Sequence, residues 1–224
     1  SSQQITVYSD TQAWNLQLLV YSGIIDEATD LDMFYLGNDK DCLSAFSAED
    51  TFSGYYSLAN DIDCTGYVFG ASKEPAGETP SNLTKQASIG PTNMRNVGLT
   101  GVFEGNGYSI TNFTPNGAGL FAAINGGTLK NVSISSAGAY SGGGAFLSAM
   151  MRNATLQNVY VDAGALAVYG TNGLSKFVIE STLENCVFKC TTPATGRTWG
   201  GLVFAIQDST FTNCYAITNR PLSA

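Results

Sequence analysis

The sequence predicts an all-β fold, a right-handed parallel β-helix (solenoid) with a short N-terminal capping helix. Three observations carry this prediction. A five-residue segment recurs at constant spacing, apolar residues align when the repeats are stacked, and the chain combines 25 glycines with many β-branched and aromatic residues. Such a composition favours strands and tight turns. The right-handed form is expected because crossovers between parallel strands are almost always right-handed.

The repeat is clearest at Thr182-Leu183-Glu184-Asn185-Cys186. Close variants begin at Thr128, Thr155 and Thr210, so the four threonines are separated by 27, 27 and 28 residues. A fixed period of this length is typical of a solenoid, in which each turn, here called a rung, stacks on the previous one because it cannot bury its own apolar face. Neighbouring rungs then lie about 4.8 Å apart, the ordinary strand spacing.

Stacking the repeats produces columns of apolar residues that should face the core. A two-residue step within the repeat places two columns on one inward strand face, whereas a three-residue step marks a corner. The columns are Ile124, Met151, Val178 and Ile206; Leu129, Leu156, Leu183 and Phe211; Val132, Val159, Cys186 and Cys214; and Ile134, Val161, Phe188 and Ala216. The residues between the last two columns must point outward, and these are Ser133, Tyr160, Val187 and Tyr215.

An asparagine stands at the predicted corner of every repeat, at Asn131, Asn158, Asn185 and Asn213. Asparagine tolerates left-handed backbone geometry and can hydrogen-bond along a stack, so we predict a structural asparagine ladder. The alternative is a row of ligand-binding amides, although buried amides are normally satisfied by their neighbours. Asn112 is expected to begin the ladder one short rung earlier.

We expect one continuous domain with two differently organised parts. Residues 1–100 would hold an N-terminal strand, the capping helix, irregular loops and the first rungs, and residues 101–224 the regular rungs with a period of about 27. A helix is predicted over residues 10–22, where it would cover the open first rung. Its signals are an N-cap at Ser9-Asp10, one helical face formed by Trp14, Leu18 and Tyr21, and a stop at Gly23. The alternation of residues 14–18 also fits a strand.

Residues 24–53 are predicted to form a long loop with an acidic cluster, comprising Asp26, Glu27, Asp30 and Asp32. Calcium binds clustered carboxylates, but the ordered ligands of an EF-hand loop, with its central glycine and terminal glutamate, are missing. We therefore favour a solvated acidic loop and expect no cofactor, with calcium as the alternative.

Several motifs in the middle and at the end of the chain belong together. Residues 55–63 are predicted to be a strand that enters a turn, and Asn106-Gly107 marks a tight turn between two apolar strands. In order and spacing, residues 56–63, 103–113, 119–121 and 211–215 resemble the GLUG-motif modules of secreted bacterial surface proteins. Glu104 departs from this pattern, since the family usually has Asp there, and Cys42 lies in an unfamiliar insert. The resemblance implies a parallel β-helix or a related solenoid in an adhesin-like, cell-surface setting, and it fixes no ligand.

The charge balance and the missing histidine exclude several classes of function. The chain has 10 basic and 18 acidic residues, a net charge of −8, and no basic stripe, which argues against nucleic acids and anionic membranes as partners. The absence of histidine excludes Ser-His-Asp and Cys-His catalysis and removes the commonest zinc ligand. No apolar run approaches the roughly 20 residues that span a bilayer, so membrane insertion is not expected.

Five cysteines cannot all form pairs. Cys42 and Cys64 are the candidate disulfide, which would pin the early loop against the first rung in an oxidising compartment. Cys186 and Cys214 stack on neighbouring rungs, where parallel side chains give poor disulfide geometry, so we favour buried free thiols. Cys190 has no obvious partner.

The favoured function is a non-catalytic extracellular surface module, adhesin-like or structural. Long turns at residues 136–144, 163–173 and 191–200 would carry any binding, and their aromatic residues Tyr140, Tyr169 and Trp199 are candidate ligand contacts. Ordinary packing within the turns is the alternative role for these side chains. Expected partners are other protein subunits or host and cell-surface glycans, at an extracellular or cell-surface location.

The repeat runs to residues 215–217 with no obvious capping helix after it. A bare last rung would expose strand edges and apolar side chains. Either the chain continues in a longer protein or another subunit covers that end, so we predict a possible homo-oligomer, including an end-to-end filament.

The alternative function is a polysaccharide-degrading β-helix enzyme, a lyase or a glycosidase. Such chemistry requires carboxylates clustered on neighbouring rungs, because one acid must protonate the leaving group while another acts as base or nucleophile. From residue 119 onward the acids are Asp162, Glu180, Glu184 and Asp208, and only Glu180 and Asp208 share a column. One isolated pair argues against catalysis, and no catalytic residue is assigned.

Overall fold

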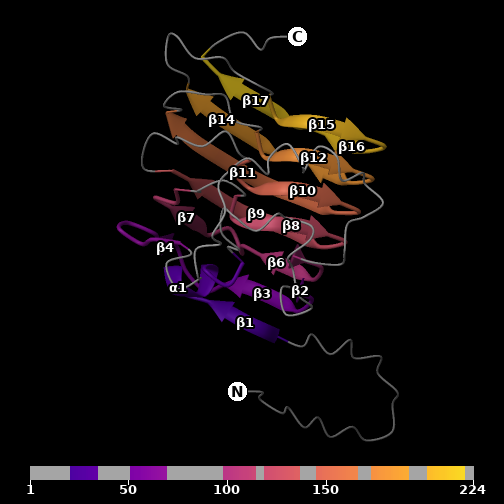
Figure 1. Cartoon of the computed structure of the whole chain (residues 1–224). Helices are drawn as coiled ribbons and strands as arrows, with labels where there is room; N and C mark the ends of the chain where they lie inside the picture. The colour runs from indigo at the N-terminus through magenta and orange to yellow at the C-terminus, as the bar shows by residue number, and fades with distance from the viewer. Residues whose placement is uncertain are drawn as a thin grey trace, which may run out of the picture.

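The computed structural model describes residues 21–34, 51–69, 98–114, 119–136, 145–165, 173–191 and 201–219. These residues form parallel strands that stack rung upon rung along one axis (Figure 1). The predicted all-β solenoid is therefore confirmed. The helix α1 is the only helix in the described ranges, and none there is long and apolar enough to cross a membrane.

Two parallel sheets make up the walls of the solenoid. One has six strands in the order β15-β12-β10-β8-β5-β2, and the other has eleven. The six are β2 Thr51–Phe52, β5 Gly98–Leu99, β8 Phe121–Asn125, β10 Ser148–Arg152, β12 Ser175–Ile179 and β15 Val203–Gln207. The eleven are β1 Tyr21–Ile25, β3 Tyr55–Leu58, β4 Ile62–Asp63, β6 Val102–Glu104, β7 Ser109–Thr111, β9 Thr128–Ser135, β11 Thr155–Ala165, β13 Thr182–Glu184, β14 Val187–Thr191, β16 Thr210–Thr212 and β17 Tyr215–Thr218.

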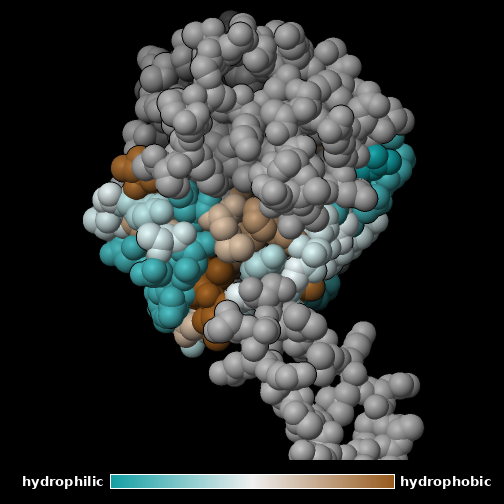
Figure 2. All heavy atoms as spheres, turned by 60° about the horizontal axis from the view of Figure 1, so that its bottom comes forward, coloured by the Kyte–Doolittle hydropathy of each residue, from teal (hydrophilic) through white to brown (hydrophobic). Residues whose placement is uncertain are grey.

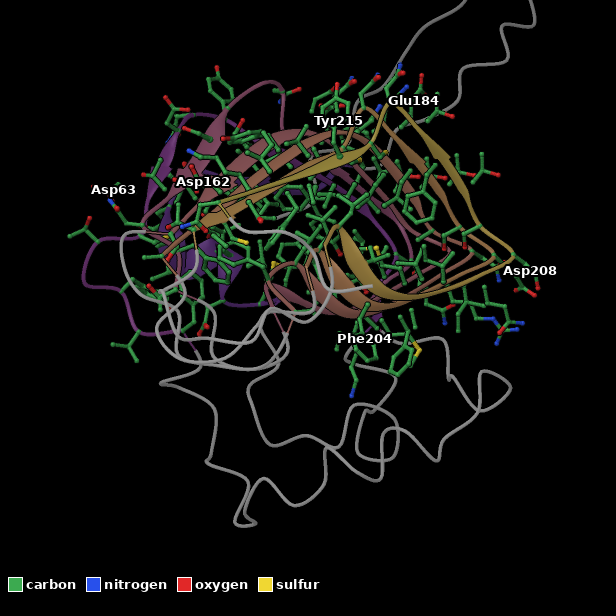
Figure 3. All side chains as sticks on the ribbon, turned by 90° about the horizontal axis from the view of Figure 1, so that it is seen from above. Asp63, Asp162, Glu184, Phe204, Asp208 and Tyr215 are labelled. Atoms are coloured by element: carbon green, nitrogen blue, oxygen red, sulfur yellow. The ribbon has the colours of Figure 1, made fainter. Side chains whose placement is uncertain are left out.

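The coil of the solenoid is right-handed, as predicted. Figure 3 is seen from the C-terminal end, and there the chain passes counterclockwise from Phe204 on β15 through Asp208 to Tyr215 on β17. Successive rungs rise toward the viewer in this view, and a counterclockwise path that approaches the viewer is a right-handed coil.

The strand register matches the column alignment made from the sequence. Leu129 pairs with Leu156, Leu156 with Leu183, and Leu183 with Phe211. The three leucines are completely buried. The outward positions between the inner columns are exposed at Ser133, Tyr160 and Tyr215. Apolar columns spaced by the repeat therefore fix which face of each strand is buried.

Two corners of each regular rung have left-handed backbone geometry. At the first corner φ is 55°, 54°, 54° and 51° for Asn131, Asn158, Asn185 and Asn213. At the second corner φ is 77°, 47°, 48° and 47° for Gly126, Asn153, Glu180 and Asp208. Only glycine adopts this geometry without strain, and asparagine and aspartate tolerate it best among the other residues. The Asn106-Gly107 turn is a corner of the same kind, with φ of 55° and 81°, and connects β6 to β7.

The N-terminal part differs from its prediction. Tyr21 lies in β1, which pairs with β3, so the helix predicted over residues 10–22 is wrong at its end, and residues 10–20 lie outside the described ranges. Strand pairing and the burial of Ile25 prevail over the helical spacing. The long loop predicted over residues 24–53 is also wrong in part, because it contains the end of β1, the helix α1 (Ala28–Leu31) and β2.

The acidic cluster caps α1. The Asp30 carboxylate accepts hydrogen bonds from the backbone N–H groups of Asp26 at 3.1 Å and Glu27 at 3.2 Å, and the Glu27 carboxylate accepts one from the Thr29 hydroxyl at 2.6 Å. Carboxylates at a helix N-terminus satisfy its free N–H groups and interact well with the helix dipole. The cluster thus has a local structural role.

An aromatic plug closes the core next to α1. The Phe34 ring is only 1% exposed and lies 5.0 Å from the rings of Phe52 and Tyr56, 5.5 Å from Phe103 and 5.3 Å from Phe121, measured between centroids. Figure 2 shows this end of the molecule, where hydrophilic side chains flank a narrower apolar strip. Phe34 therefore fills the interior of the first rungs, between residues of both sheets.

The last rung, formed by β15, β16 and β17, is built differently. Ile206 is 59% exposed although Ile124, Met151 and Val178, the other members of its column, are completely buried. Phe211, Cys214 and Ala216 are likewise partly exposed, unlike most of their columns. In the described part of the chain, the core columns therefore reach the surface at this end.

Candidate binding face

The outward side of the second part of each rung, formed by β7, β9, β11, β14 and β17, carries exposed tyrosines. We call Tyr108, Tyr160 and Tyr215 the tyrosine face; they are 37%, 37% and 57% exposed. Tyr160 and Tyr215 share one outward column with Ser133 and Val187, in the order Ser133, Tyr160, Val187, Tyr215. Tyr108 directly precedes Ser109, which pairs with Ser133.

Two of these tyrosines lie two rungs apart in one column, because Tyr160 on β11 pairs with Val187 on β14, and Val187 pairs with Tyr215 on β17. Tyr108 lies two rungs below Tyr160 but outside this column, since Ser109 rather than Tyr108 is aligned with Ser133. Two rungs correspond to about 10 Å at the ordinary strand spacing. The sequence predicted that Tyr160 and Tyr215 point outward, but it did not place Tyr108, which lies in the irregular part of the chain.

Polar side chains flank the tyrosine face on one side. The Lys189 ammonium lies 2.7 Å from the Asp162 carboxylate on the rung below. Its hydrogen bond to Asp162 and the charge of that carboxylate, with a smaller effect of Tyr160, raise the pKa of Lys189. The pair is solvent-accessible and carries no net charge.

The asparagine ladder flanks the face on the other side. Each amide nitrogen donates to the amide oxygen one rung nearer the N-terminus: Asn158 to Asn131 at 2.8 Å, Asn185 to Asn158 at 3.0 Å and Asn213 to Asn185 at 3.2 Å. Beyond the ladder the Gln157 amide donates to Glu184 at 3.1 Å. The ladder holds the corners in register and leaves exposed amide edges along the solenoid.

Glu104 forms the base of the ladder. One of its carboxylate oxygens accepts hydrogen bonds from the Asn131 amide and the Asn106 backbone N–H, both at 2.9 Å, and the other lies 3.1 Å from the Lys130 ammonium. Burial raises the pKa of Glu104, but the bonds from Asn131, Asn106 and Lys130 outweigh it, so the pKa lies below the ordinary value of 4.5. The sequence had marked Glu104 only as a departure from the GLUG pattern.

Asn112 does not begin the ladder. Its amide donates to Asp63 and to the Thr65 hydroxyl, both at 2.8 Å, at a separate corner after β7. It has the left-handed φ of 58° expected for a corner asparagine, but the short strand β7 pairs with the far part of β9, next to Ile134. The register, rather than the residue type, excludes Asn112 from the ladder.

The stacked acids do not converge on a reaction site. Glu180 and Asp208 occupy consecutive second corners, where Arg152 lies 3.4 Å from Glu180 and the Gln207 amide donates to Asp208 at 3.3 Å. Asp162, Glu184 and Asp208 lie at separate places round the perimeter (Figure 3). Across the described ranges, His, Cys, Asp and Glu side chains form no group of three or more that could hold a metal ion.

Several predicted site residues lie outside the described ranges, namely Tyr140, Tyr169, Trp199 and Cys42. Their roles as ligand contacts and as half of a disulfide stay predictions. Cys64, the predicted partner of Cys42, is buried, and burial raises the pKa of its thiol to about 11.

Cys186, Cys190 and Cys214 are free thiols, and Cys186 and Cys214 lie in one core column. The Cys186 thiol donates to the Glu184 carbonyl at 3.3 Å and the Cys214 thiol to the Thr212 carbonyl at 3.2 Å. Burial raises the pKa of Cys186 to about 12. A thiol with so high a pKa is a poor nucleophile at neutral pH, so Cys186 serves as a small core residue.

Comparisons with known proteins add no relative: no family model, no curated protein and no solved structure matches the chain. The resemblance to GLUG-motif modules stays a prediction, and the function must be argued from the geometry.

Proposed function

We propose that this chain is a non-catalytic, adhesin-like or structural module of the cell surface, and that its last rung is an assembly surface. The observation that carries the assembly proposal is the 59% exposure of Ile206 at the end of a column that is otherwise completely buried. The resemblance to secreted bacterial surface modules supports the extracellular location.

Within the described residues, the last rung offers apolar side chains and strands that have a strand partner on one side only. In the described part of the chain β15, β16 and β17 each pair with a strand on one side only, namely β12, β13 and β14. Edge strands of this kind readily pair with another chain. Burying an isoleucine side chain completely is worth about 1.5–3 kcal/mol, so covering Ile206, Phe211 and Ala216 would stabilise an assembly.

Two modes of assembly differ in what they require of the N-terminal end. A filament needs that end to receive the last rung of the next copy, whereas a two-fold pairing brings two last rungs together. Among the described residues, β1 and β2 at the N-terminal end likewise pair on one side only, with β3 and β5, so both modes have strand edges to use. In light scattering, a filament would appear as particles whose size keeps increasing with protein concentration.

Binding rather than catalysis is supported by the arrangement of the acids. Asp162 is paired with Lys189, Glu184 accepts from Gln157, and Glu180 lies beside Arg152. The stacked corner acids Glu180 and Asp208 keep a polysaccharide-degrading enzyme as the second candidate. An assay for new reducing or unsaturated ends on polysaccharide substrates tests it, and activity lost in Asp208→Asn would replace our proposal.

Assembly is tested by light scattering and negative-stain electron microscopy across a concentration series. We expect dimers or longer end-to-end particles that dissociate on dilution. Ile206→Lys should abolish association, because it places a charge in the contact. Ile217→Lys is the matched control, since Ile217 is 49% exposed and belongs to the outward column of Asp162 and Lys189 on the same rung. Monomers at every concentration, or equal effects of both variants, would overturn the assembly proposal.

A further inference from the structure

We propose that the tyrosine face binds an extended, uncharged polysaccharide whose chain lies along the solenoid axis. This deepens the proposed function and rests on its adhesin-like part. It assigns the binding to Tyr160 and Tyr215 rather than to the long turns considered in the sequence.

The period of the tyrosines is the first argument. Tyr160 and Tyr215 lie in one column two rungs apart, about 10 Å by strand spacing, with the smaller Val187 between them. In an extended β-linked glycan with a two-fold repeat, every second sugar turns the same face to the same side. The two rings therefore match two sugar faces that lie two residues apart in the glycan. The β-propensity of tyrosine explains exposed tyrosines in a sheet but gives no reason for their place two rungs apart in one column.

The chemistry of the exposed rings is the second argument. Tyrosine presents an apolar ring face and a hydroxyl group, and it loses little conformational entropy when it is immobilised. The apolar C–H face of a pyranose can pack on such a ring. Both rings project from paired strands whose corners are fixed by the ladder, so the platform is rigid before a ligand arrives.

The flanking polar groups are the third argument. Sugar hydroxyls both donate and accept hydrogen bonds, and the face offers both kinds of partner: ladder amides on one side, and the Asp162 carboxylate and Lys189 ammonium on the other. Since Asp162 and Lys189 neutralise one another and the chain carries a net charge of −8, an anionic glycan is disfavoured. These features together select an uncharged glycan.

Titration of the whole chain with β-1,4-linked hexasaccharides of glucose, mannose, xylose and N-acetylglucosamine, followed by calorimetry, tests the proposal. We expect at least one to bind, and Tyr160→Ala and Tyr215→Ala each to raise its Kd roughly three- to tenfold, with a larger loss in the double variant. Phe204→Ala is the matched control: Phe204 is 45% exposed and lies on the opposite side of the solenoid from Tyr215 (Figure 3).

Each outcome decides between defined alternatives. Failure of all four sugars to bind, unchanged affinity in both tyrosine variants, or an equal loss in Phe204→Ala would overturn the polysaccharide site. The assembly measured by light scattering would be unaffected by that failure. Binding accompanied by cleavage of the hexasaccharide would preserve the site but overturn the non-catalytic function.

Discussion

The two ends of the described solenoid differ in how much of the apolar core they expose. At the N-terminal end Phe34 lies among four other aromatic rings and is 1% exposed, and the ladder ends on the buried carboxylate of Glu104. At the last rung the column ends on the exposed Ile206, and the ladder ends on Asn213. Repetition builds the walls of the solenoid, but closing an end requires residues that break the repeat.

The difference also gives the solenoid a direction. Every ladder amide donates toward Glu104, which as a carboxylate can only accept, so the chain of hydrogen bonds terminates there. Within the described residues no group donates a hydrogen bond to the amide oxygen of Asn213, which leaves an acceptor at the same end as the exposed apolar columns. Any partner that covers the last rung should therefore supply an N–H donor as well as apolar side chains.

The plug at the closed end should give the largest effect on stability. Phe34→Ala removes a buried ring from a cluster of five, and we expect a loss of about 3–5 kcal/mol in the free energy of unfolding. Urea denaturation followed by far-UV circular dichroism measures it. Ile24→Ala, at a position that is 63% exposed on β1, is the control and should change stability by less than about 0.5 kcal/mol. Similar losses in both variants would contradict the plug.

One column allows a direct comparison of covered and uncovered rungs. Met151→Ala, within the stack, should cost about 2–5 kcal/mol, whereas Ile206→Ala, in the same column on the last rung, should cost less than about 1 kcal/mol. Chemical denaturation at protein concentrations below any association measures both. A cost at Ile206 as large as that at Met151 would mean that the last rung is covered within a single chain.

The ladder should be more sensitive in its middle than at its end. Asn185 has a left-handed φ of 54°, donates to Asn158 and accepts from Asn213, so Asn185→Ala should cost about 2 kcal/mol from backbone strain and lost hydrogen bonds. Asn213→Ala loses a single ladder bond and should cost less. Asn185→Gly separates backbone strain from the lost hydrogen bonds, because glycine adopts the left-handed geometry without strain but has no amide side chain to form the bonds. Equal destabilisation by glycine and alanine would exclude backbone strain as a cause.

The repeated part of the fold could be predicted from the sequence because each core column has a member in each of four repeats. A single apolar residue such as Leu129 is ambiguous, but its agreement with Leu156 and Leu183 fixes both register and burial. The strand β1 and the helix α1 occur once, and there the helical spacing that includes Tyr21 competed with strand pairing that depends on β3, more than 30 residues away. Local periodicity carries no information about such a distant partner.

The candidate binding face was only partly predictable for the same reason. The outward direction of Tyr160 and Tyr215 followed from the two-residue step between inward columns, but the place of Tyr108 depends on the short strand β7, whose register the repeat does not reach. Glu104 was missed as the base of the ladder because its partner Asn131 is brought close only by stacking. In both cases the missing information is the pairing between an irregular rung and the first regular one.

The smallest effect is expected at the base of the ladder, where it should depend on pH. The pKa of Glu104 is lower in the folded chain than its ordinary value of 4.5, because bonds from Asn131, Asn106 and Lys130 outweigh the effect of burial. A carboxylate with a lowered folded pKa stabilises the fold above its unfolded pKa, and this stabilisation is lost as the pH falls through the folded pKa.

Glu104→Gln keeps the acceptor oxygen for Asn131 but loses the charge beside Lys130, so we expect a loss of about 1 kcal/mol at neutral pH. The difference between wild type and Glu104→Gln in urea denaturation should shrink as the pH is lowered below about 4.5. Asp61→Asn is not a suitable control, since the pKa of Asp61 is also lowered by Ser109; Ser133→Ala, which changes no titrating group, should instead give a pH-independent difference. A Glu104→Gln difference that stays constant with pH would show that the carboxylate charge does not stabilise the closed end.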